Sequence, residues 1–161
     1  MPLFVWTNQL SVGVKLLDND HKKLMLLINQ LHEGLIKGSS KPALERVFDD
    51  LVSYTRVHHA HEEQLFIETG YKGSAAHILE HDSTVDRAVE LQMRFNNSEG
   101  LGAELEVVRH LREWLFRHIH GSDQDFVSHF KAKKIDAILA TRNTLDGREP
   151  AKVPRVMQGA W

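Results

Sequence analysis

The sequence predicts an all-α protein. Four segments repeat apolar residues at spacings of three and four, the period of one helix face, and turn residues separate the segments. No stretch shows the apolar and polar alternation of a half-buried strand. At 161 residues the chain is long enough for one domain with a sizeable core.

The first two helical segments begin and end at cap and turn residues. The first is predicted to begin after an N-cap at Asp18 or Asn19 and to stop near the Gly-Ser-Ser run at 38–40. The second is predicted to open around Pro42, a residue favoured in the first helical turn, and to end before Gly70.

The third and fourth segments follow the same rules, with one irregularity. The third is predicted to start after residues 73–74 and to end in the polar run at 96–100. The fourth starts near Ala103, and its apolar register slips by one residue near Gly121. A π-bulge would absorb the extra residue, and such bulges are frequent at functional sites.

The two ends of the chain lie outside the helical pattern. Residues 1–17 carry apolar side chains without helical phase, and we expect them to pack across the helices as an arm. Residues 141–161 contain two prolines and two glycines and are predicted to form a flexible or loosely docked tail. The predicted organisation is one domain over residues 1–140, arm included, followed by this tail.

Composition argues against several classes of partner. The chain has 20 Lys and Arg against 22 Asp and Glu, a formal charge of −2, which predicts no binding to nucleic acid or to an anionic membrane. No apolar run approaches the ~18 residues of a membrane span. The N-terminus does not have the pattern of a signal peptide, so a cytoplasmic location is expected. The well-charged polar faces of the helices favour a monomer.

Seven polar side chains fall on the apolar faces of the helices. They are His21, His58, Glu62, His77, His81, His118 and Asp123. A buried imidazole or carboxylate needs a partner, because burying an unpaired polar group is costly. Pairs four residues apart project from one helix face toward a shared point. The chain contains no cysteine, so nitrogen and oxygen are the available ligands, and bound metal would satisfy all seven groups.

The number of ligands suits two metal ions. If both carboxylates bridge and the ions share one oxygen atom, shared ligands fill three of six positions on each ion. Five imidazoles divided three and two then leave one position open, where two ferrous ions could each give one electron to O₂. Iron, zinc, copper and nickel all accept imidazole ligands, and the bridged pair favours iron.

Six other histidines and one glutamate have a simpler interpretation. The histidines expected at the surface, because they lie off the apolar faces or lack a partner at ligand spacing, are His32, His59, His61, His110, His120 and His129. Glu63 lies one residue out of phase with Glu62, so we interpret it as solvated, with orientation of a metal ligand as the alternative.

Five short motifs, in this order and spacing, resemble the hemerythrin family in its bacterial single-domain form. They are WTNQLSVGV near the N-terminus, DNDH ending at His21, HHAHEEQLF with an HxxxE pair, HILEH with an HxxxH pair, and WLFRHIHGSD with an HxxxxD pair. The resemblance covers roughly residues 4–130. It implies an up-down-up-down four-helix bundle with two non-haem iron ions, joined by an oxo or hydroxo bridge, that binds O₂ reversibly as peroxide on the five-coordinate iron.

The resemblance also implies a role for individual residues. The six-coordinate iron would be held by His77, His81 and His118. The five-coordinate iron would be held by His21 and His58, with Glu62 and Asp123 bridging the two ions. In the WLFRHI motif, the positions that match the family's dioxygen pocket are Trp114, Leu115 and Ile119.

Three functions are compatible with the predicted two-metal site. The first is reversible O₂ binding for transport, storage or sensing, with a recipient oxygenase or redox partner. The second is a di-iron oxidase or peroxidase, but the chain lacks the ExxH motif of ferritin-like oxidases, and every inward polar group is already used as a ligand. The third is a metal-storing or structural bundle, which would have no use for an open coordination position. We therefore expect an O₂-binding protein and not an enzyme.

Overall fold

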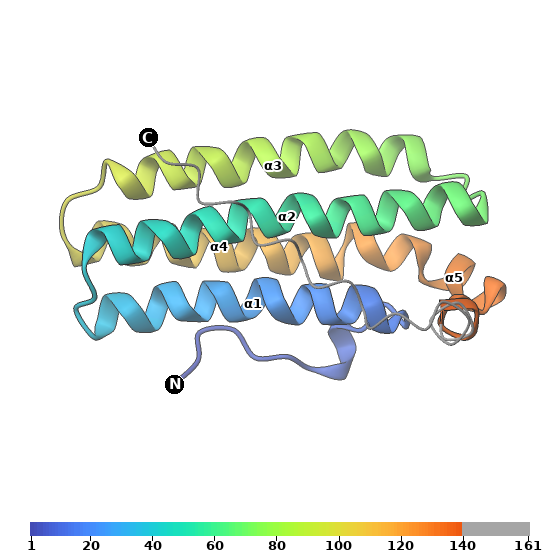
Figure 1. The fold of residues 1–161 in the computed structure, drawn as a ribbon, viewed down its shortest axis with the longest axis horizontal. Coiled ribbons are helices and arrows are strands. Elements are labelled where there is room, and N and C mark those ends of the chain that lie inside the picture. Colours follow the sequence, from blue (N-terminus) through green and yellow to red (C-terminus); the bar gives the residue numbers. More distant parts are fainter. Residues whose placement is uncertain (140–161) are drawn as a thin grey trace, which may run out of the picture.

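Four long helices form an up-down-up-down bundle in the computed structural model, which describes residues 1–139 (Figure 1). The helices are α1 (Lys15–Ile36), α2 (Lys41–Thr69), α3 (Ser74–Asn96) and α4 (Leu101–His120). Short connections join them, so neighbours in sequence lie antiparallel in space. The predicted all-α fold is confirmed. No helix within residues 1–139 is long and apolar enough to cross a bilayer.

Helix α2 begins and ends where the sequence predicts. Pro42 lies in its first turn, where the missing backbone N–H costs no hydrogen bond. Gly70 ends the helix in the left-handed conformation, with φ of +67°, which glycine adopts without a steric penalty. The backbone N–H of Tyr71 then donates to the carbonyl of Phe66 at 3.1 Å.

Helix α1 begins at Lys15, so the expected N-cap at Asp18 or Asn19 is wrong. The Asp18 carboxylate serves the preceding arm instead. It accepts hydrogen bonds from the backbone N–H of Val12 at 2.9 Å and from the hydroxyl of Ser11 at 2.6 Å. These bonds hold residues 11–14 against the first turn of the helix.

The segment before α1 lies along the outside of the bundle and contains a short 3₁₀ helix, η1 (Asn8–Leu10) (Figure 1). Phe4 and Leu10 from this segment are buried in the core. The backbone of Phe4 forms two hydrogen bonds with the Asn29 side chain, at 2.8 and 2.7 Å. The tail predicted at 141–161 lies outside the described residues.

The expected π-bulge near Gly121 is wrong, because the register slip is absorbed by a break in the helix. Helix α4 ends at His120, and the chain continues as a 3₁₀ helix, η2 (Ser122–Phe126), and a short helix, α5 (Val127–Lys133). Gly121 has φ of −98° and ψ of −92°. A Cβ atom at this position would lie 2.6 Å from the carbonyl oxygen of Arg117, so the turn requires glycine.

The apolar core consists of two clusters. The larger fills the body of the bundle and includes Leu24, Phe48, Phe95 and Leu115. The smaller lies beside α5 and is made of Val12, Val14, Leu17, Leu65, Phe66, Phe126, Phe130 and Ile135. Along α1 and α2, the inward polar residues fall between members of the two clusters. Apolar packing therefore closes the polar layer from both sides.

Candidate metal centre

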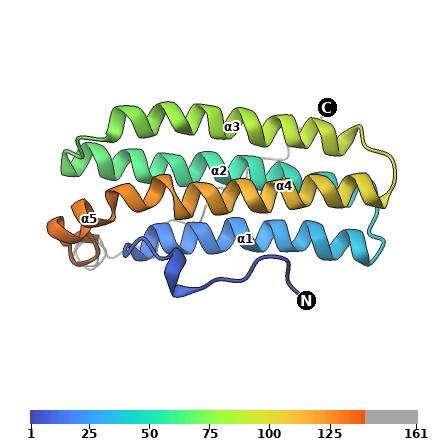
Figure 2. The same ribbon diagram turned by 180° about the vertical axis from the view of Figure 1, so that it is seen from behind.

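All seven polar side chains selected from the sequence are buried and come together at one end of the bundle. That end holds the first turns of α1, the connection from α2 to α3, and α5 (Figure 2). The exposed fractions of the seven lie between 0 and 6%. They come from α1 (His21), α2 (His58, Glu62), α3 (His77, His81), α4 (His118) and η2 (Asp123).

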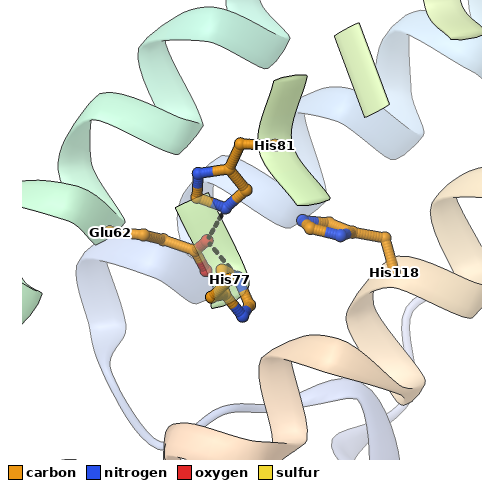
Figure 3. A group of neighbouring side chains, drawn as sticks. All are labelled: Glu62, His77, His81 and His118. Atoms are coloured by element: carbon orange, nitrogen blue, oxygen red, sulfur yellow. Dashed lines mark hydrogen bonds and ion pairs between the residues drawn. The ribbon is translucent and has the colours of Figure 1, made fainter. Parts of the chain in front are cut away.

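The seven side chains form two overlapping groups whose candidate ligand atoms lie within 4.8 Å of one another. The first group contains Glu62, His77, His81 and His118, and these four side chains point toward a common centre in Figure 3. The second group contains His21, His58, Glu62 and Asp123. Glu62 belongs to both groups.

Each carboxylate directs one oxygen toward each group. For Glu62, Oε2 lies 3.2 Å from Nε2 of His77 and 3.0 Å from Nε2 of His81, whereas Oε1 lies 3.7 Å from Nε2 of His58. For Asp123, the distances are 3.4 Å from Oδ1 to Nε2 of His77, 3.2 Å from Oδ1 to Nε2 of His118, and 3.1 Å from Oδ2 to Nε2 of His21. This is the arrangement that carboxylates need in order to bridge two cations.

Many of these polar atoms have no hydrogen-bond partner within residues 1–139, although they are buried. They are both ring nitrogens of His21, His58 and His118, Oε1 of Glu62 and both oxygens of Asp123. Several of the imidazole nitrogens lie close to a carboxylate oxygen, but without the geometry of a hydrogen bond. Because native proteins rarely leave buried polar atoms unpaired, the cluster is poorly explained as a hydrogen-bond network. A nitrogen and oxygen donor set of this kind fits first-row transition metals.

Comparison with known proteins agrees with this geometry. The family described as "Hemerythrin HHE cation binding domain" matches residues 12–130. The chain belongs to the hemerythrin family. Two curated relatives are bacteriohemerythrins. The one from Stenotrophomonas maltophilia (strain R551-3) is 36% identical over 132 residues, covering 82% of this chain and 84% of that protein. The one from Pseudomonas aeruginosa (strain LESB58) is 37% identical over 127 residues, covering 79% of this chain and 81% of that protein.

Solved structures of hemerythrin share the fold of this family member. A wild-type hemerythrin crystal structure gives a TM-score of 0.68 at 28% identity, covering 78% of this chain and 96% of that one. A hemerythrin variant with a leucine-to-alanine substitution gives a TM-score of 0.70 at 27% identity, covering 80% of this chain and 98% of that one. The resemblance inferred from the five motifs is therefore confirmed.

Mutual attraction of imidazoles and carboxylates governs protonation in this hemerythrin centre. Burial would lower the pKa of His77, but the neighbouring carboxylates of Asp123 and Glu62 raise it to about 10. Burial would also raise the pKa of Asp123, yet the neighbouring His118 and His21 hold it well below its usual range. A bound cation would take the place of these protons, so metal binding and protonation compete.

Glu63 and Glu80 contact the outer nitrogens of two of the histidines. Oε1 of Glu63 lies 2.8 Å from Nδ1 of His81, which matches the alternative interpretation of Glu63. An Nδ1–H donated to this carboxylate leaves Nε2 of His81 unprotonated and directed at the centre. Oε1 of Glu80 lies 3.9 Å from Nδ1 of His118 and also accepts a hydrogen bond from the Ser122 hydroxyl.

Asp20 is a buried residue of the site that the sequence reading missed. One of its oxygens accepts a hydrogen bond from the Tyr54 hydroxyl at 2.7 Å, and the other lies 2.7 Å from Nδ1 of His61 and 3.8 Å from Nδ1 of His58. Although burial opposes it, these partners hold the pKa of Asp20 well below its usual range. The available signal was its spacing, four residues before the core residue Leu24.

The expectation that His59 lies at the surface is wrong. Only 4% of His59 is exposed, and its ring is stacked in parallel on that of His81, with the centroids 3.8 Å apart and the planes at 2°. Burial lowers the pKa of His59. Since Asp20 and His59 are buried outside both ligand groups, the argument that every inward polar group is a ligand also fails.

The remaining histidines expected at the surface vary in exposure. His120 is exposed, whereas the partly buried ones are His32, His61, His110 and His129. His61 contacts Asp20, and Nε2 of His129 lies 2.9 Å from the hydroxyl oxygen of Thr69.

The three residues that the family resemblance assigns to a dioxygen pocket all lie on α4 near His118. Leu115 and Ile119 are fully buried members of the larger apolar cluster. Trp114 is partly buried and, together with His118, lines a surface hollow of about 470 Å³. Their role with dioxygen stays a prediction.

Proposed function

We propose that this hemerythrin-family chain binds two iron ions in its buried centre and binds dioxygen reversibly there. The observation that carries the proposal is the pair of overlapping ligand groups, in which each carboxylate directs one oxygen to each group. When bound, ferrous iron supplies reversible electron transfer to dioxygen. Transport, storage and sensing are all compatible with this chemistry.

The proposed ligands divide unequally between the two ions. One ion would be held by His77, His81 and His118, and the other by His21 and His58, with the carboxylates of Glu62 and Asp123 shared between the two groups. This division follows the two groups of ligand atoms. The second group supplies one imidazole fewer than the first, which would leave room there for a small molecule.

The protein around the centre favours binding over turnover. Residues of the two apolar clusters lie on both sides of the polar layer and limit access of bulk water. We propose that Trp114, Leu115 and Ile119 line the space that dioxygen occupies. Leu115 lies about one turn before His118 and Ile119 directly after it, and both are buried and offer no acidic group.

The test of this function is anaerobic reconstitution with ferrous iron, followed by elemental analysis and spectroscopy. We expect two irons per chain and a nearly colourless reduced protein. On exposure to air a visible absorption band should appear, and it should disappear again under vacuum. Steady consumption of O₂ in the presence of a reductant, without a reversible band, would favour the oxidase.

The assignment of His77 is tested by the His77→Ala variant. We expect fewer than two irons per chain and a lower thermal midpoint, because a buried site loses a ligand. The matched control is His120→Ala, which removes an exposed imidazole from the same end of the bundle. An unchanged iron content in the His77 variant would remove this residue from the ligand set.

An oxidase or peroxidase is the second candidate, and one observation favours it. His59 is a buried imidazole close to the centre but outside both ligand groups, which is where a residue that transfers protons would lie. A recipient oxygenase or redox partner, a monomeric state and a cytoplasmic location stay predictions from the sequence.

A further inference from the structure

We propose that His59 donates a hydrogen bond, from the N–H at Nε2, to the small molecule that enters the centre. That molecule is dioxygen or a small anion, both of which offer acceptor atoms of the required size. The inference rests on the proposed function, because it assumes an open coordination position at the iron pair. It adds a residue that contacts the entering molecule without binding metal.

The first observation is an unpaired nitrogen in a buried ring. His59 is 4% exposed, and its Nε2 has no hydrogen-bond partner within residues 1–139. Leaving a buried polar atom unpaired is costly, so such atoms usually have a partner that is water, an ion or a ligand. His59 belongs to neither group of candidate metal ligands. A metal ion therefore does not explain the free nitrogen.

The second observation is that the ring lies close to members of both ligand groups. The ring centroid of His59 lies 5.6 Å from that of His58 and 5.5 Å from that of His118. His58 belongs to one group and His118 to the other. The imidazole thus lies beside both proposed iron sites.

The third observation is that contacts with His81 fix the ring. His59 stacks on His81 in parallel, and Glu63, one helical turn further along α2, holds Nδ1 of His81 at 2.8 Å. A stacked ring presents its nitrogens at its edge and not toward its neighbour's face. The hydrogen-bond donor is therefore held in place before any ligand enters.

The fourth observation is access from solvent. His59 lines a surface hollow of about 630 Å³ together with Ala60, Glu63, His81 and Val85. His81 is also a candidate metal ligand, so this hollow reaches the edge of the centre. A small molecule that enters from this side meets His59 and His81 together.

Two variants test the inference. His59→Phe keeps an aromatic ring for stacking but has no donor, and His59→Gln places an amide N–H₂ close to the position of Nε2. The probe is azide, titrated against the oxidised, iron-loaded protein. We expect His59→Phe to raise the Kd for azide about 10- to 100-fold, the range for a hydrogen bond to a charged group. His59→Gln should recover most of the affinity.

A second readout uses the metal-free protein and separates ligand binding from packing. His59→Phe removes an unpaired buried nitrogen, so we expect its thermal midpoint to equal or exceed that of the unsubstituted protein. Equal azide affinity in the unsubstituted protein and His59→Phe would overturn the inference, as would a glutamine variant as weak as the phenylalanine one. If the unsubstituted protein itself fails to hold two irons, the proposed function fails instead.

Discussion

At the scale of single residues, the centre depends on carboxylates that hold the outer nitrogens of its histidines. Glu63 contacts Nδ1 of His81. Asp20 lies close to Nδ1 of His61 and to Nδ1 of His58. The helical period of the core identifies the seven inward groups in the sequence, but it does not identify Asp20 and it places His59 at the surface. The roles of Asp20 and His59 depend on contacts with side chains of other helices, and the spacing of residues along one helix does not contain this information.

Substitution of Glu63 should weaken metal binding without removing a metal ligand. In Glu63→Gln the charge that favours the Nδ1–H tautomer of His81 is lost, so we expect metal affinity to fall about 10- to 100-fold. Competition with a chelator of known affinity measures the change. Asp50→Asn, which alters an exposed carboxylate on the same helix, is the control and should leave the affinity unchanged. Equal affinity in both variants would contradict this role for Glu63.

The stability of the metal-free protein should depend on pH in a defined direction. The pKa of His77 is raised from 6.5 to about 10, so its contribution is fully present below pH 6.5 and is lost as the pH rises toward 10. The pKa of Glu62 is lowered from 4.5 to about 2, so its contribution is present above pH 4.5 and is lost as the pH falls toward 2.

Below pH 6.5 the lowered pKa values of His58 and His59 oppose the effect of His77, so the decline in stability with rising pH is expected above pH 6.5. Urea unfolding of metal-free protein at pH 7, 8 and 9 checks the expectation, with the midpoint falling at each step. The amount of metal bound should increase as the pH rises, because protons compete with the metal for the imidazoles. A metal-free midpoint that rises between pH 7 and 9 would contradict the direction given for His77.

At the scale of elements, the junction between α4 and η2 decides where Asp123 lies. Five residues of regular helix would turn Asp123 well away from the direction of His118. The break at Gly121 brings Oδ1 of Asp123 to 3.2 Å from Nε2 of His118. The sequence located this irregularity correctly but assigned the wrong device, because a register slip of one residue does not distinguish a π-bulge from a break in the helix.

Gly121→Ala should disturb this junction. The new Cβ atom would lie 2.6 Å from the carbonyl oxygen of Arg117, so we expect a loss of about 1–3 kcal/mol in the free energy of unfolding and a lower iron content. Denaturant unfolding and elemental analysis measure the two effects. Gly102→Ala is the matched control, since nothing lies within 4 Å of its Cβ atom, and it should be neutral or stabilising by up to about 1 kcal/mol.

At the scale of the whole molecule, the centre connects all four helices near one end of the bundle. The larger apolar cluster can hold the rest of the four-helix bundle together without metal, since it contains the fully buried rings of Phe48 and Phe95. The end with the centre has buried polar atoms that lack partners within residues 1–139. Metal removal should therefore loosen that end more than the other.

Removal of metal with a chelator should lower the thermal midpoint, since the folded chain binds the ions and the unfolded chain does not hold the site together. Amide hydrogen exchange should rise most around His21, His58 and His77, and least around Phe48 and Phe95 at the other end. Hydrogen exchange with mass spectrometry resolves these segments. Uniform acceleration along all four helices would show that the bundle has no metal-independent part.

The sequence by itself determined the helical class, the helix faces and the seven side chains directed inward, because each of these follows from the period of one helix. Tertiary structure decided which oxygen of Glu62 and Asp123 faces which imidazoles, that Glu63 holds His81, and that His59 is buried beside it. The physical reason is that helical periodicity gives the direction of a side chain from its own axis. Contacts between side chains also depend on the distance, rotation and axial offset of neighbouring helices, which are fixed when the apolar clusters pack together.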